Sequence, residues 1–289
     1  DSLDRLLAAA LAGEHAAALA AIEERHRQLA TELGIGVSPA LEQHFTELRL
    51  GIASVVQKGA VSDRTRARVL ASGELMASEL GARFLRAQDI DCSWWDARQG
   101  LRSELRTRAA PAAGFLSATC DFSADDRLRA QLEALGPVVL TPGFIASNAA
   151  GETVLLGRGG SDTSGAYLAA RLRAVRLEIW TDVAGMFSAN PRSIPAARLL
   201  RALHYDEAQE IASAGAKVLH PRCIPPARQA QIPIWIYDTQ TPQLEGTHIS
   251  AGGGDGAAQV KAVCIKKGIT LVSLDNPGMW HEVGFLADA

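Results

Sequence analysis

The chain has 289 residues, of which 47% are hydrophobic and 21% charged, and its formal net charge is −3. This usage predicts a folded protein with a sizeable core, and the charge excludes a basic field for nucleic acid or an anionic membrane. Since it contains neither an apolar stretch of about 18 residues nor a signal peptide, we expect a soluble, cytoplasmic protein.

The first part of the chain predicts helices. Residues 1–33 are rich in alanine and leucine, with an interruption at Gly13. Residues 39–57 predict a second helical segment, because apolar side chains recur there at helical spacing. They are Leu41, Phe45, Leu48, Ile52 and Val56.

A further helix is predicted from Ser62 and Asp63, which form a cap signal. Residues 72–74, Ser-Gly-Glu, interrupt its pattern, which resumes at Leu75. Glu74 by itself is typical of an ordinary first-turn carboxylate favoured by the helix dipole.

Strands follow in the middle of the chain. Residues 90–95 predict a short strand whose two tryptophans belong to the core, and arginine-rich residues 98–108 predict a solvated surface. Residues 137–146 predict a strand that is broken at Pro142-Gly143. The cysteines form no Cys-x-x-Cys pair, so we interpret them as reduced, mostly buried thiols and expect no metal site. They are Cys92, Cys120, Cys223 and Cys264.

Residues 151–174 organise the chain. Residues 153–156 predict a buried strand, residues 157–160 hold three glycines in four positions, and Ser161 is an N-cap candidate. A helix is predicted from Asp162, with Leu168, Leu172 and Val175 on one face. Residues 177–181 close the pattern as a second strand, which predicts a βαβ unit.

The glycine-rich turn predicts an anion site. Glycines let a ligand approach the backbone, and the amino end of a helix favours a phosphate or a carboxylate. Arg158, Ser161 and Asp162 add polar groups, and a second polar turn at residues 181–183 should face the same crevice. The alternative is that the glycines only form a tight turn. The spacing fits neither the P-loop nor the dinucleotide pattern.

The remaining residues predict a loop at 181–192, a helix at 205–213 that stops at Gly215, and a strand at 232–237. Residues 251–256 predict a glycine-rich linker, followed by strands at 260–265 and 269–274 and a helical tail at 279–289. Lysine is scarce, and Lys217 is the one that lies within a motif. Alone, it is also typical of a cation that complements a helix dipole.

Four motifs together resemble the aspartokinases of the amino-acid kinase superfamily, most closely their lysine-sensitive type. They are residues 156–162, Trp180-Thr181-Asp182, Asn190-Pro191-Arg192 and residues 215–221, in matching order and spacing. The resemblance implies an α/β fold, a three-layer αβα sandwich of the amino-acid kinase (carbamate kinase-like) type. Residues 1–250 would form this domain without its first strand, 251–259 a linker, and 260–289 the start of an ACT-type α+β regulatory domain.

The resemblance also implies an activity, the transfer of a phosphoryl group from ATP, as its Mg2+ complex, to the side-chain carboxylate of L-aspartate. The product would be 4-phospho-L-aspartate, the first intermediate toward lysine, threonine and methionine. A homodimer or higher homo-oligomer is implied through the regulatory domain, with no nucleic-acid or membrane partner.

Site residues are carried over at matching positions. On the substrate side, Glu74 would contact the amino group of aspartate, Arg158 would hold its α-carboxylate, and Ser161 would contact it too. Gly159 and Gly160 would present amides to the moving phosphoryl group, and Asp162 would orient the lysine or magnesium that meets the phosphates.

On the nucleotide side, the resemblance assigns Thr181 and Asp182 to the nucleoside, and places Arg192 and Lys217 near the phosphates. Val218 and Phe187 would line the nucleotide site. Two departures weaken these contacts, because Phe187 replaces the usual tyrosine and Asn190 replaces the usual aspartate before Pro-Arg.

A third departure is that the Lys-Phe-Gly-Gly-Thr-Ser-Val strand with which aspartokinases begin is not in this sequence. We therefore expect a fragment truncated at both ends, with little or no kinase activity alone. Three alternatives stay open: another amino-acid or carbamate kinase, a non-catalytic amino-acid sensor, and a kinase part fused to a second enzyme such as diaminopimelate decarboxylase.

Overall fold

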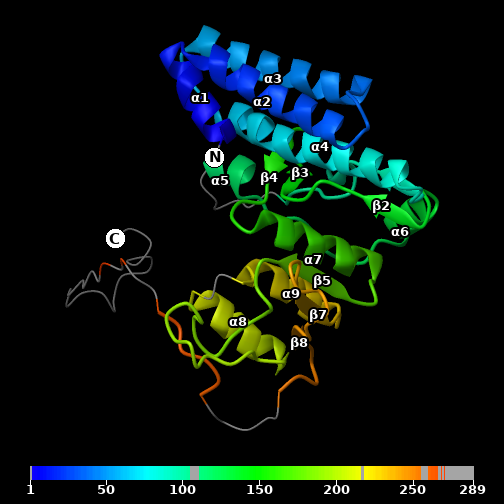
Figure 1. The fold of residues 1–289 in the computed structure, drawn as a ribbon, viewed down its shortest axis with the longest axis vertical. Coiled ribbons are helices and arrows are strands. Elements are labelled where there is room, and N and C mark those ends of the chain that lie inside the picture. Colours follow the sequence, from blue (N-terminus) through cyan, green and yellow to red (C-terminus); the bar gives the residue numbers. More distant parts are fainter. Residues whose placement is uncertain are drawn as a thin grey trace, which may run out of the picture.

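The structure is a computed structural model that describes residues 2–104, 111–215, 218–254 and 260–265 together with Gly268 and Thr270. A layer of helices is followed by short strands, a central helix and a four-stranded sheet with its own helices (Figure 1). Within these ranges, no helix combines the length and the apolar character that crossing a bilayer requires.

The helical layer consists of α1 (Ser2–Ala12), α2 (His15–Glu32), α3 (Pro39–Lys58) and α4 (Asp63–Ala87) (Figure 1). The break expected at Gly13 is confirmed, since this residue separates α1 from α2 with a φ of 78°. The cap at Ser62 is confirmed too, because its hydroxyl accepts the amide of Thr65. On α3 the expected apolar face is buried as far as Ile52, but Val55 continues it, and Val56 is 41% exposed.

α4 is a single helix of 25 residues, so the interruption expected at residues 72–74 is wrong. Ser72 Oγ donates to the carbonyl of Val69, which keeps the hydroxyl bonded within the helix. A Cβ on Gly73 would lie only 3.1 Å from Leu3 Cδ1 of α1. The small residues therefore permit helix–helix packing and do not end the helix.

Two pairs of short strands come next. β1 (Cys92–Trp94) is parallel to β2 (Val138–Leu140), and β3 (Ile145–Ser147) is antiparallel to β4 (Thr153–Leu155). These strands confirm those expected at 90–95, 137–146 and 153–156. The connecting elements are η1 (Ala97–Gln99), α5 (Pro111–Leu116) and α6 (Asp126–Glu133).

α7 (Gly160–Leu172) leads into a four-stranded sheet of order β5-β7-β8-β6. Its strands are β5 (Leu177–Thr181), β6 (Ala202–Leu203), β7 (Ile234–Asp238) and β8 (Thr247–Ile249). The accompanying helices are α8 (Tyr205–Ser213), η2 (Pro221–Cys223) and α9 (Ile224–Gln229). The strands expected at 177–181 and 232–237 and the helix at 205–213 are thus confirmed.

The pairing expected for the βαβ unit is wrong, because β4 and β5 belong to different sheets. β4 pairs with β3 through a hairpin whose turn is closed by Asn148 Oδ1, which accepts the amides of Ala150 and Glu152. β5 pairs with β7 instead. α7 ends at Leu172, so Val175, expected on its apolar face, is 90% exposed.

Three buried clusters form the core. The helical core joins α1 to α4 and includes Phe45 and Met76, and the upper core joins the other face of α4 to β3 and β4. The lower core lies between the four-stranded sheet, α8 and α9. α7 contributes Tyr167 to the upper core and Ala166 to the lower core. The four cysteines are free thiols, as expected.

The carboxyl-terminal region departs from expectation where it is described. Residues 260–265 form no regular strand, although the amide of Val263 donates to the carbonyl of Ser188 at 2.8 Å. Ala262 and Cys264 pack against the lower core. The expected helical tail and most of the strand at 269–274 lie outside the described residues, and the domain limits stay predictions.

Candidate active site

The glycine-rich turn, residues 157–160, joins the end of β4 to the start of α7. Gly157 and Gly159 have φ values of 76° and 64°, which side chains with a Cβ rarely adopt. Gly159 is the N-cap, so the prediction that Ser161 would cap the helix is wrong, and Ser161 is an exposed residue of the first turn. No side chain caps α7. Its amino end therefore presents amides and a positive dipole end to an anion.

Close packing around this turn leaves room for glycine only. A Cβ on Gly159 would lie 2.2 Å from Cγ of His220. A Cβ on Gly160 would lie 2.5 Å from Cδ2 of Phe144, which itself has a φ of 68° and donates its amide to Ser164 Oγ. The turn is therefore fixed from two sides, by the segment after β2 and by the segment before η2.

Asp162 lies in the first turn of α7, where its Oδ2 accepts the amide of His220 at 3.1 Å. Burial lowers the pKa of the His220 imidazole, Arg222 and Arg158 act in the same direction, and Asp162 opposes them. His220 was not predicted as a site residue, although it belongs to the motif at 215–221. The structure thus brings two of the predicted motifs into contact.

Glu74 lies within α4, so the first-turn interpretation of this carboxylate is wrong. Burial raises the pKa of the Glu74 carboxyl above its ordinary value. α4 packs along β4, whose far end carries the glycine-rich turn and the exposed Arg158. A carboxylate whose charge is disfavoured by burial is suited to an ammonium partner.

The predicted nucleotide residues Thr181 and Asp182 lie at the carboxyl end of β5. Thr181 Oγ1 donates to Asp182 Oδ1, and the Thr181 carbonyl accepts both the amide and the hydroxyl of Thr239. Asp238 stands opposite Thr181 in the parallel register, and hydrogen bonds from the Gln240 amide and the Thr241 hydroxyl hold its pKa below its usual range. The turn that follows β7, at residues 238–241, was not predicted from the sequence, although the strand expected at 232–237 could have indicated it.

The other predicted nucleotide residues are more dispersed. Phe187 is half-buried and pairs with Leu199, Arg192 is exposed, and Val218 packs against the lower core. Lys217 lies outside the described residues. In the parts of the chain that the structure describes, no hydrogen bond or ion pair joins residues 181–192 to the glycine-rich turn. The glycine-rich turn is therefore bonded to the motif at 215–221, through Asp162 and His220, whereas Thr181 and Asp182 lie at the end of β5.

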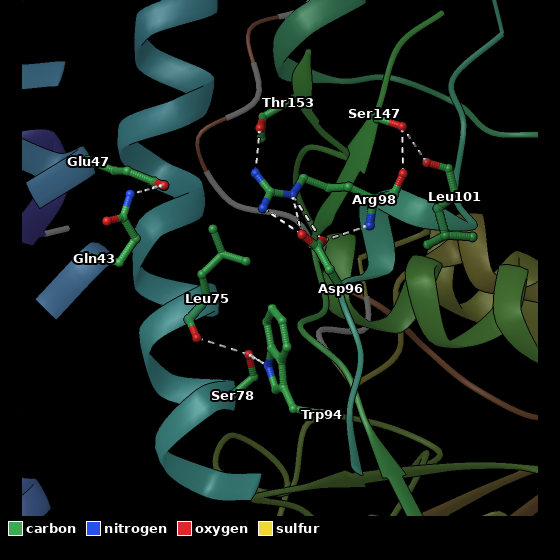
Figure 2. Close-up of polar contacts among 10 residues, drawn as sticks. All are labelled: Gln43, Glu47, Leu75, Ser78, Trp94, Asp96, Arg98, Leu101, Ser147 and Thr153. Atoms are coloured by element: carbon green, nitrogen blue, oxygen red, sulfur yellow. Dashed lines mark hydrogen bonds and ion pairs between the residues drawn. The ribbon is translucent and has the colours of Figure 1, made fainter. Parts of the chain in front are cut away.

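The opposite end of β4 is held by a polar cluster, Asp96, Arg98 and Thr153 (Figure 2). The Arg98 guanidinium donates to both carboxylate oxygens of Asp96 and, at 2.9 Å, to Oγ1 of Thr153, the first residue of β4. A small cavity with His44, Glu47 and Arg98 in its wall lies beside it. Because Arg98 is committed to these two partners, the cluster anchors the start of β4.

Comparison with known proteins extends this description. Residues 8–238 match the model of the amino acid kinase family. The chain is 35% identical over 230 residues to the lysine-sensitive aspartokinase 3 of Escherichia coli K12, covering 79% of this chain and 50% of that protein. It is 31% identical over 257 residues to an aspartokinase of Chlamydia muridarum, covering 88% and 56%.

Solved structures give the same result. A structure of E. coli aspartokinase III in complex with lysine and aspartate has a TM-score of 0.75 at 30% identity and covers 99% of this chain and 64% of that one. Another, with aspartate and ADP, has a TM-score of 0.70 at 30% identity and covers 88% and 56%. The chain thus spans about half the length of the two curated aspartokinases described above. Since the family model covers most of the chain and the fold agrees, the chain belongs to the amino acid kinase family.

Proposed function

We propose that this protein phosphorylates the side-chain carboxylate of L-aspartate with ATP, as its magnesium complex, to give 4-phospho-L-aspartate and ADP. The observation that carries the proposal is the uncapped amino end of α7 with Arg158 directly before it. Relatives named aspartokinase, and their solved structures with aspartate and ADP, support the same assignment.

The chemistry needs no general base, because a carboxylate is already a nucleophile at pH 7. One of its oxygens attacks the γ-phosphorus, a new P–O bond forms, and the bond to the β,γ-bridging oxygen breaks. ADP leaves with that electron pair. The protein has to position two anions and to stabilise negative charge on the moving phosphoryl group.

The residues around the glycine-rich turn supply these functions. Arg158 would hold the α-carboxylate as a fork, and Glu74 would hold the ammonium group. The amides of Gly159 and Gly160 would stabilise the phosphoryl oxygens at the helix end, and Ser161 would contact the substrate. These roles follow the family resemblance.

The nucleotide would bind along the ends of β5 and β7. Thr181 and Asp182 would contact the nucleoside, with Phe187 and Val218 beside it. Arg192 and Lys217 would lie near the phosphates, and Asp162 would orient the lysine or magnesium. We further propose a homo-oligomer assembled through the region beyond residue 259.

The test is a coupled assay of ADP formation, run on the full polypeptide that contains this chain, with aspartate, glutamate and acetylglutamate as acceptors. We expect turnover with aspartate, trapped by hydroxylamine as the acyl phosphate. Arg158→Ala should lower kcat/KM about a hundredfold, whereas Arg176→Ala, whose exposed side chain pairs with Glu178, should not. Aspartate binding that does not depend on ATP, with no turnover, would favour a sensor instead.

A further inference from the structure

Arg222 of η2 joins two parts of the chain that lie far apart in sequence. Its Nη1 donates to the carbonyl of Leu156, 66 residues away, and its Nη2 donates to the carbonyl of Ala118, 104 residues away, at 2.7 Å. Nη1 also lies 3.5 Å from Ser117 Oγ. A planar guanidinium can hold diverging acceptors in one fixed arrangement, which a lysine ammonium does less well.

These contacts have a particular place relative to the glycine-rich turn. Leu156 is the last residue before the turn, and Asp162 follows it. Arg222 binds the carbonyl of Leu156, and the backbone amide of His220, two residues before Arg222, binds the carboxylate of Asp162. One short segment, residues 220–222, therefore holds both ends of the turn.

Arg222 also restrains the side of the glycine-rich turn that faces Ser117 and Ala118. Gly157 packs on Ser117, where a Cβ would lie 2.8 Å from the hydroxyl oxygen. Since Arg222 also binds the carbonyl of Ala118, it fixes the surface against which Gly157 rests. Without the Arg222 side chain, the glycine-rich turn would no longer be restrained on the side that faces Ser117.

We propose that Arg222 is a positioning residue for phosphoryl transfer, which keeps Arg158 and the amides of residues 159 and 160 in register with residues 220–222. The inference rests on the proposed function. Arg222 acts through Leu156 and Ala118 and does not itself have to touch a substrate.

The experiment compares Arg222→Met and Arg222→Lys with Arg228→Met in the full polypeptide. Arg228 is a matched control, because it lies on the adjacent helix α9 and pairs with Asp206 at an exposed position. In Arg222→Met, kcat should fall about tenfold to a hundredfold while KM for ATP stays within about twofold. Arg222→Lys should be intermediate, and the control should match the unsubstituted protein.

Deuterium exchange gives a second readout. Amides of residues 157–163 should exchange faster in Arg222→Met and not in Arg228→Met, with the rest of the chain unchanged. Unaltered kcat and unaltered exchange would overturn the inference, as would a uniform rise in exchange over the whole chain, which indicates a purely structural role. If the unsubstituted protein does not phosphorylate aspartate, the proposed function fails, and exchange alone then decides whether Arg222 holds the turn.

Discussion

Replacing Gly159 with alanine adds one methyl group at the most crowded point of the glycine-rich turn, and leaves the backbone amide in place. The φ of 64° costs an L-residue about 1–2 kcal/mol. The new Cβ would lie 2.2 Å from Cγ and 2.3 Å from Cβ of His220. These atoms are close to the backbone, so a simple rotation of the ring does not relieve the contact, and overpacking adds about 1–3 kcal/mol.

A shift of His220 away from the new methyl group would strain the hydrogen bond between its amide and Asp162. We therefore expect Gly159→Ala to lose about 2–5 kcal/mol of unfolding free energy and at least about tenfold in kcat/KM for aspartate. Urea denaturation and the coupled assay measure the two effects.

Gly151→Ala is the matched control. Gly151 lies in the β3–β4 hairpin with a φ of 76°, and no atom outside its own stretch of chain comes within 4 Å of where a Cβ would stand, so its substitution costs only the backbone strain. It should keep full activity. If Gly159→Ala were no less stable than Gly151→Ala and equally active, the reasoning about the packed turn would be refuted.

Three further predictions concern stability. Burial raises the pKa of Glu74, so its ionisation opposes folding, and the stability present below its ordinary pKa is lost as pH rises through the raised value. Glu74→Gln should thus melt at a higher temperature at pH 7 while binding aspartate more weakly by calorimetry; a lower melting temperature would contradict this. Burial lowers the pKa of His44, so stability is full above its ordinary value of 6.5 and falls as pH drops through the lowered value. His44→Gln should flatten that acid loss in urea titrations, and an unchanged profile would count against it. Ser38 caps α3 and donates to the buried Glu79, so Ser38→Ala should cost about 1–3 kcal/mol, against about 0.5–1 kcal/mol for the exposed cap Ser62. Equal losses in thermal melts would show that the Glu79 contact contributes nothing.

Helices and strands were predictable where local rules decide them. Gly13 and Ser62 mark helix ends through backbone conformation and capping, and these are properties of a few neighbouring residues. Strand pairing was not predictable in the same way. β4 pairs with β3, and β5 pairs with β7, which lies more than 50 residues further along the chain. The same holds for Gly73, whose partner Leu3 is on another helix.

The candidate site shows the same division. Arg158, Gly159 and Asp162 were predicted because they lie within five residues of one another, at the glycine-rich turn and the start of the following helix. His220 and Arg222 were missed as site residues, since their role depends on how η2 packs on α7 and reaches Leu156, which no local pattern encodes. Phe144 was missed for a similar reason, because its contact with Gly160 joins two separate loops.

The length of α4 has a consequence for how the protein unfolds. An unbroken helix of 25 residues is about 37 Å long, and the helical core packs on one face of it while the upper core packs on another. Because both cores share this helix, we expect them to unfold together. Calorimetry should therefore record a single endotherm for both layers, with equal van't Hoff and calorimetric enthalpies. Glu74, near the middle of this rod, would then keep its place until the whole assembly melts.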